Sequence, residues 1–238
     1  MTDLVLLPGL DGTGALFAPL IAHLPSQLRP IVVSYPPDQP LGYDQLLPRV
    51  LDALPATTPF TLLGESFSGP LALMAAARLP VGLRAVILCA SFVRNPLPPG
   101  TALLRRCVRG VCFRFAPEFL RTWALLGKHA TPELHQLTAR AIAAVPPHVL
   151  AHRVRAVVGV DVRSALEVCP VPILYLRGTA DRVVGRQNWL HVRRVSPSAQ
   201  LSELPAPHFL LQTQPAAAAA AITDFLATRS GIATRSNR

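Results

Sequence analysis

Short apolar runs alternate with longer segments of helical spacing along most of this chain. The runs are rich in Val, Ile and Leu, which is typical of strands buried on both faces of a parallel sheet. The expected strands are 3–7, 30–34, 60–64, 85–89, 173–176 and 200–203. The segments with helical spacing are 14–23, 43–54, 66–79, 186–195 and 215–227. This alternation predicts an α/β fold with a doubly wound, mostly parallel six-stranded sheet.

The alternation stops between residues 92 and 164, where helix-like segments and several prolines occur without a good strand. An insertion of this size after the carboxyl end of a strand usually lies over the active-site crevice of an open α/β sheet. We therefore expect a helical cap at 92–164 and a core made of 1–91 and 165–229. Residues 230–238 are polar without apolar periodicity, which predicts a disordered tail.

The composition indicates a protein with one sizeable core and without a membrane-spanning segment. The chain has 238 residues and is 50% hydrophobic, which suffices for one sizeable core. It opens without the basic region of a signal peptide and has no apolar stretch long enough to cross a membrane, so we expect neither export nor a transmembrane segment. The 4 cysteines lack metal-type spacing and lie mostly in apolar runs, which suits a reducing cytoplasm.

The segment 61–73, TLLGESFSGPLAL, joins an apolar strand to a helix of small residues through a turn at Ser66. It is nearly a nucleophile elbow, in which a serine on a strained strand-to-helix turn projects its hydroxyl above the sheet. The second glycine of that motif is replaced here by Ser68, which is still small. Two alternatives stay open, a plain turn and Ser68 as nucleophile. The sequence favours Ser66, because only Ser66 lies at the sharp turn.

A serine hydroxyl needs a neighbouring base to take its proton, commonly a histidine that a carboxylate orients. After a nucleophile elbow the usual order along the chain is serine, acid, histidine. His208 lies in the loop after the last expected strand, and Asp181 lies in the turn after the strand at 173–176. His208 could instead pack locally, and Asp181 could form an Asx turn. Because both follow strands in the expected order, we expect a triad of Ser66, Asp181 and His208.

Four segments resemble the α/β-hydrolase family, and together the resemblance covers the chain except the cap and tail. They are LLPGLDGTG at 6–14, GESFSG at 64–69, GTADRVV at 178–184 and PHFLLQTQP at 207–215. Within the family, the chain most resembles small bacterial carboxylesterases of the pimeloyl-carrier methyl ester esterase type, which also have a four-helix cap. The resemblance implies that Ser66, Asp181 and His208 occupy the triad positions.

The resemblance also implies an oxyanion hole made by the backbone N–H groups of Leu10 and Phe67. Two departures from the family pattern affect this expectation. Pro8 replaces the histidine that usually precedes the loop glycine. The chain also starts at the family's third strand, so we expect the fold to lack the N-terminal hairpin and its sheet edge to be covered in another way.

The net charge of +10 comes almost wholly from arginine, and much of it lies in the expected cap. We expect most of these side chains to form a solvated face, because long basic side chains extend over apolar helices. The alternative is attraction of an anionic partner such as an acyl carrier, coenzyme A or a membrane surface. Nucleic acid is disfavoured because no aromatic-rich basic face is evident. The basic residues are Arg94, Arg105, Arg106, Arg109, Arg114, Arg121, Lys128, Arg140, Arg153, Arg155 and Arg163, against Glu118, Glu133 and Asp161.

Metal and cofactor chemistry are not expected. His148 and His152 lie four apart, but no third ligand is evident nearby and two prolines disturb that helix start. The sequence thus predicts a carboxylesterase that acts on small-molecule esters with short to medium acyl chains, with a thioesterase on acyl carriers or a non-catalytic binding protein as alternatives. The apolar cap residues would either line the acyl pocket or dock the cap onto the core: Phe113, Phe115, Phe119, Trp123, Leu125 and Leu126.

Overall fold

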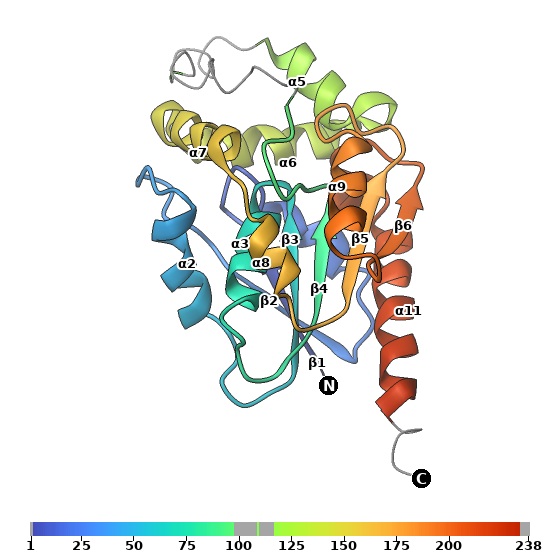
Figure 1. Ribbon diagram of the computed structural model, residues 1–238. Helices are drawn as coiled ribbons and strands as arrows, with labels where there is room; N and C mark the ends of the chain where they lie inside the picture. Colours follow the sequence, from blue (N-terminus) through green and yellow to red (C-terminus); the bar gives the residue numbers. More distant parts are fainter. Residues whose placement is uncertain (1, 98–108, 110–116, 234–238) are drawn as a thin grey trace.

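A six-stranded parallel sheet forms the centre of the computed structural model, which describes residues 2–97, 109 and 117–233 (Figure 1). Its order is β2-β1-β3-β4-β5-β6, and every strand pair is parallel. All six predicted strands are present, so the predicted fold class is confirmed. They are β1 Thr2–Leu7, β2 Leu28–Val32, β3 Phe60–Glu65, β4 Leu83–Cys89, β5 Ile173–Gly178 and β6 Gln200–Leu204.

The four central strands, β1, β3, β4 and β5, bury side chains on both faces, as their apolar runs predict, whereas the edge strands β2 and β6 are partly exposed. In β1, Val5 and Leu7 pack into one core cluster, whereas Leu4 and Leu6 pack into the other. This alternation follows from the two-residue repeat of a strand. Each face must therefore be covered by its own helices.

Helices lie on both faces of the sheet. The first face is covered by α2 Tyr43–Asp52, α3 Gly69–Ala76, α8 Arg163–Glu167 and α9 Gln187–Val195. The second is covered by the 3₁₀ helix η1 Ala15–Phe17, α1 Ala18–Ile21, α10 Leu210–Thr213 and α11 Pro215–Ala233. Right-handed crossovers between parallel strands produce this doubly wound arrangement.

Within the segment expected as a cap, three helices lie over the carboxyl ends of the strands (Figure 1). They are α5 Glu118–Leu125, α6 Pro132–Ala143 and α7 Pro147–Gly159, with a short 3₁₀ turn, η4 Gly127–His129, after α5. Val145, Val149 and Leu150 form a small core of their own, against which Leu10 packs from the loop after β1. Residues 98–108 and 110–116 of the expected cap lie outside the described residues.

The last helix continues further than its apolar pattern predicts. α11 runs to Ala233, whereas the expected helix ends at 227 and the expected tail begins at 230. Its alanine run has high helix propensity, and Ile222 and Phe225 anchor it on the sheet, so extra turns cost little. Residues 234–238 of the expected tail lie outside the described residues. Among the described helices, none has the length and hydropathy needed to cross a membrane.

Candidate active site

Ser66 lies at the sharp turn between β3 and α3, in the 3₁₀ turn η2 Ser66–Ser68. Its φ of 49° is in the left-handed region, which a non-glycine residue occupies only when its surroundings enforce it. Small neighbours permit this turn. A Cβ on Gly64 would clash with the backbone of Ser68, and one on Gly69 would clash with Ser91. The motif thus presents a half-buried Ser66 hydroxyl at the carboxyl edge of the sheet.

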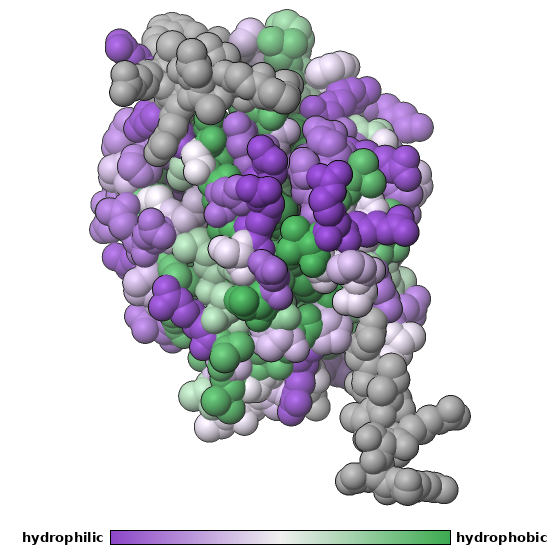
Figure 2. Space-filling view, in the orientation of Figure 1, coloured by the Kyte–Doolittle hydropathy of each residue, from purple (hydrophilic) through white to green (hydrophobic). Residues whose placement is uncertain are grey.

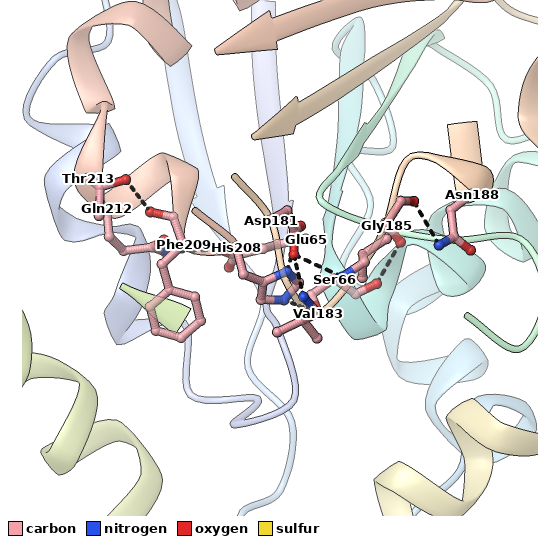
Figure 3. Close-up of polar contacts among 12 residues, drawn as sticks. Glu65, Ser66, Asp181, Val183, Gly185, Asn188, His208, Phe209, Gln212 and Thr213 are labelled. Atoms are coloured by element: carbon pink, nitrogen blue, oxygen red, sulfur yellow. Dashed lines mark hydrogen bonds and ion pairs between the residues drawn. The ribbon is translucent and has the colours of Figure 1, made fainter. Parts of the chain in front are cut away.

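The structure brings Ser66, His208 and Asp181 into one hydrogen-bonded chain, drawn in Figure 3. The Ser66 Oγ lies 2.9 Å from His208 Nε2, and His208 Nδ1 lies 2.9 Å from Asp181 Oδ2. The side chains of His208 and Asp181 are 4% and 0% exposed. A carboxylate on Nδ1 holds the neutral imidazole with Nε2 unprotonated, so that Nε2 can accept the serine proton.

Asp181 also forms the Asx turn that the sequence left as an alternative. Its Oδ1 accepts hydrogen bonds from the backbone N–H groups of Val183 and Val184, both at 2.8 Å. The two interpretations of Asp181 are therefore compatible, because each uses a different carboxylate oxygen. The turn fixes the carboxylate, and the fixed carboxylate faces His208.

The loops that bear Asp181 and His208 are tied to each other by backbone contacts. Thr179 N–H donates to Leu204 O at 2.8 Å, and Ala180 N–H donates to Ala206 O at 3.0 Å. Gly178 permits this approach, because a Cβ there would clash with the Ala206 carbonyl. The distance between acid and base is thus set by the ends of two paired strands, β5 and β6.

Glu65, directly before Ser66, is a buried acid whose importance the sequence analysis missed. Gln212 Nε2 donates to Glu65 Oε1 at 2.9 Å and also lies 3.1 Å from Leu16 O. Burial raises the pKa of Glu65 to about 7, against the opposing effect of the Gln212 hydrogen bond. The available signal was an acidic residue at the end of a strand whose other residues are all uncharged.

The two expected oxyanion residues lie in segments that follow two neighbouring strands, β1 and β3. Leu10 is in the loop that follows β1, and Phe67 is in η2. The register pairs Leu7 with Gly64, which brings this loop next to the elbow. Phe67 is buried, and its ring stacks on Tyr43 at 4.7 Å between centroids.

Ser68 has a different position from the one a nucleophile requires. It is fully buried, its Oγ lies 2.6 Å from the Tyr35 hydroxyl, and it donates to the carbonyl of Pro8. The hydroxyl is therefore engaged with the loop after β1, whereas the Ser66 hydroxyl is the one that meets His208. This geometry disfavours the alternative in which Ser68 is the nucleophile.

Arg153 is an exception to the expected solvated basic face. It comes from α7, yet it is 0% exposed. It donates to the carbonyls of Leu10 at 3.0 Å, Asp11 at 2.8 Å and Pro36 at 3.0 Å. A signal was present in the sequence, because Arg153 follows Val149 by four residues and Leu150 by three, which places it on the apolar face of α7.

The remaining candidates are the two histidines considered as metal ligands and the apolar residues of the cap. His148 and His152 both lie on α7, and the described residues contain no group of three or more metal-ligating side chains. Among the cap residues proposed as pocket wall, Leu126 is buried, whereas Phe119 and Trp123 are exposed. Phe113 and Phe115 lie outside the described residues. Trp123 instead stacks with Arg182, whose guanidinium carbon lies 4.4 Å from the ring centroid.

Comparisons with known proteins agree with this fold. The model of the alpha/beta hydrolase family matches residues 4–221. A pimeloyl-[acyl-carrier protein] methyl ester esterase from Stenotrophomonas maltophilia is 32% identical over 83% of this chain and 82% of its own. An enzyme of the same name from Xanthomonas oryzae pv. oryzae is 32% identical over 83% of each chain.

Solved structures share the fold at lower identity. A hydrolase from Oleispira antarctica has a TM-score of 0.81 at 15% identity, covering 94% of this chain and 90% of its own. The enol-lactonase from Burkholderia xenovorans has a TM-score of 0.78 at 20% identity, covering 95% and 91%. The relatives are esterases, which supports an enzyme with ester hydrolase activity. The family match and the relatives together show that this chain belongs to the α/β-hydrolase family.

Proposed function

We propose that this protein is a serine hydrolase that cleaves carboxylic esters through an acyl-enzyme on Ser66. The observation that carries the proposal is the hydrogen-bonded chain from Asp181 through His208 to Ser66. These are the contacts that a nucleophile, a general base and an orienting acid require. The left-handed backbone of Ser66 supports the same assignment, because strain of this kind gathers at functional sites.

In the proposed reaction the Ser66 Oγ attacks the acyl carbon while its proton passes to His208 Nε2. The tetrahedral intermediate collapses, the C–O bond to the alcohol breaks, and the alcohol leaves with the proton from Nε2. Water then repeats the sequence on the acyl-enzyme and releases the acid. Asp181 stabilises the imidazolium in both steps without taking its proton.

The negative charge on the intermediate oxygen requires donors that are already in place. The proposed donors are the backbone N–H groups of Phe67 and Leu10. Loss of one such donor typically costs about 3 kcal/mol of transition-state stabilisation. Leu10 stays suitable although Pro8 replaces the usual histidine, because a backbone donor needs no particular side chain.

For the substrate, we propose a short to medium acyl chain whose methyl ester is presented on an acidic carrier protein. The names of the two relatives support a carrier-bound ester. Hydrophilic side chains gather on the upper half of the face in Figure 2. In the described part of the chain, burial and the nearby charges of Arg94, Arg194 and Arg163 lower the pKa of His191. Asp161, which pairs with Arg163 at 2.6 Å, offsets part of this charge and leaves the cluster with a positive excess. Such a concentration of positive charge favours an anionic partner.

Labelling with a fluorophosphonate probe tests the mechanism. We expect a covalent adduct on Ser66, located by mass spectrometry of the digested protein, and no adduct in Ser66→Ala. An adduct on Ser68, or none on folded wild-type protein, would contradict the proposal and favour the non-catalytic alternative.

Ester hydrolysis at two salt concentrations tests the substrate. A carrier-bound methyl ester should be cleaved faster than the free methyl ester at low salt, and the advantage should shrink as salt screens the charges. A carrier-bound thioester serves as the control for the thioesterase alternative. Equal rates on free and carried esters at both salt concentrations would indicate a plain carboxylesterase.

A further inference from the structure

We propose that Arg153 is a positioning residue through which the cap sets the oxyanion loop, defined here as residues 8–14. The inference rests on the proposed serine mechanism and adds a residue to it. Arg153 lies on α7, beyond the core strands, and no motif of the sequence includes it. Its role follows from what its guanidinium contacts.

The environment of Arg153 is unusual for a cation. It is fully buried, and burial lowers the pKa of its guanidinium, although an arginine stays protonated in proteins. Its hydrogen-bond partners are three main-chain carbonyls, those of Leu10, Asp11 and Pro36. The nearby charge of Asp11 offsets part of the cost of burying this cation, yet the hydrogen bonds of the guanidinium go to main-chain carbonyls. This pattern indicates that fixing those carbonyls has a function.

The loop is shaped to receive this side chain. Gly12 has a φ of +71°, and a Cβ on it would lie 2.6 Å from Arg153 Nη1. Tyr35 lies on the other side, with its ring centroid 5.8 Å from the guanidinium carbon and its N–H donating to Gly12 O at 2.8 Å. Glycine at position 12 thus serves both the left-handed turn and the room for the guanidinium.

A second contact holds the same loop from the elbow. Ser68 donates to the carbonyl of Pro8, and the Tyr35 hydroxyl lies 2.6 Å from Ser68 Oγ. The carbonyl of Pro8 belongs to the peptide group before the Gly9–Leu10 peptide, and the carbonyl of Leu10 belongs to the group after it. The Gly9–Leu10 peptide is itself held, because Gly12 N–H donates to Gly9 O at 3.0 Å. Contacts on this peptide and on both of its neighbours together restrict the direction of the Leu10 N–H.

This arrangement accounts for two replacements in the family motifs, Ser68 for glycine and Pro8 for histidine. Ser68, where the motif has glycine, supplies the hydroxyl that reaches Pro8. Pro8, where the family usually has histidine, has no hydrogen-bonding side chain. Arg153 instead binds the loop from the cap, through the carbonyls of Leu10 and Asp11. Because α7 carries Arg153, a displacement of α7 would also displace one donor of the oxyanion hole.

The test compares turnover with binding in variants of the full chain. Arg153→Met should lower kcat by about 10²-fold, the usual effect of losing one oxyanion donor, with KM within about threefold of wild type. Arg153→Lys keeps the charge but lacks the planar guanidinium, so its kcat should lie between those of wild type and Arg153→Met. The inhibition constant of a trifluoromethyl ketone, which forms an oxyanion on the serine, should rise in proportion to the fall in kcat/KM. Arg140→Met, an exposed arginine of α6, is the matched control and should leave all three values unchanged.

Gly12→Ala tests the same contact without changing Arg153. Its Cβ would displace the guanidinium, so kcat should fall while KM stays nearly constant. Gly42→Ala is its control, because a Cβ there meets nothing closer than 3.7 Å. Where Arg153→Met fails to fold, Arg153→Lys and Gly12→Ala decide the question. Wild-type kcat in a folded variant at position 153 or 12, or a rise in KM alone, would overturn the proposal.

Probe labelling of the wild-type protein distinguishes failure of the proposed serine mechanism from failure of the proposed role of Arg153. Absence of a Ser66 adduct on the wild-type protein would remove the serine mechanism and with it the oxyanion hole. A Ser66 adduct together with unchanged kcat in the Arg153 variants would retain the mechanism and reject only the role of Arg153.

Discussion

The cap meets the two sides of the candidate active site in different ways. On the elbow side, which comprises Ser66, Ser68 and the oxyanion loop, the cap makes buried contacts. The polar one is the guanidinium of Arg153, and Leu10 packs on the small apolar core of the cap. On the acid–base side, which comprises Asp181 and His208, the contact is made by α5 at the surface. There Arg182 stacks on Trp123, which is 56% exposed, and Phe209 N–H donates to Leu125 O at 3.0 Å.

The difference separates two tasks of the same cap. A buried polar contact loses much when broken, because its partners are left without hydrogen bonds and out of reach of water. An exposed contact loses little, because water replaces it. The elbow side should therefore transmit a change in the cap to the chemistry, while the acid–base side should depend on its own strands and loops.

The largest expected effect lies within the acid–base side. Asp181→Asn keeps Oδ1 for the turn at Val183 and Val184 but turns an amide N–H₂ towards His208 Nδ1, which forces the unproductive tautomer. Ester turnover should fall by about 10⁴-fold with the fold intact. Steady-state kinetics on a p-nitrophenyl ester measures this, with the exposed Asp224→Asn as control. Near-full activity would mean that another carboxylate orients His208.

A smaller effect is expected from the buried acid of the elbow side. Because burial raises the pKa of Glu65 from its ordinary value to about 7, the folded state holds a proton that the unfolded state releases at lower pH. The contribution of Glu65 to stability is therefore fully present below about pH 4.5 and is lost as pH rises to about 7. The loss amounts to about 3 kcal/mol.

Glu65→Gln should remove this dependence and leave a neutral group that can still meet Gln212. The variant should be more stable than wild type at pH 8, and the difference should vanish towards pH 4. Thermal unfolding at both pH values measures it, with the exposed Glu167→Gln as control. A stability difference that is the same at both pH values would show that Glu65 does not titrate in this range.

The smallest effect is expected where the cap meets the acid–base side. Trp123→Ala removes a cation–π contact worth about 1 kcal/mol at an exposed site. The melting temperature should fall by less than about 4 °C, with kcat unchanged. Phe119→Ala on the same helix is the matched control. A loss of kcat as large as that expected for Arg153→Met would show that both sides depend on the cap, and the comparison would fail.

The sequence alone determined the elements and the order of the candidate chemistry. Apolar runs predicted the four central strands β1, β3, β4 and β5, because a strand buried on both faces of a parallel sheet has few polar positions to interrupt it. The edge strands β2 and β6 are partly exposed and contain polar residues, and β2 begins and ends two residues before its expected range. The positions of Ser66, Asp181 and His208, each after a strand, sufficed to predict that they meet, because carboxyl ends of parallel strands lie at one edge. The end of α11 was less predictable, since an alanine-rich helix can continue past its last anchored turn.

Only the tertiary structure decided which groups bind the oxyanion loop and which environment sets the pKa of Glu65. Arg153 contacts the carbonyls of Leu10 and Asp11, which lie 143 and 142 residues away in the chain. Backbone carbonyls are the same in every residue, so no side-chain pattern marks them as partners of a distant arginine. The pKa of Glu65 likewise depends on the atoms that surround it in space. The periodicity of a sequence indicates which face of a helix or strand is apolar. The partners of a buried charge depend on how elements that are far apart in the chain pack together.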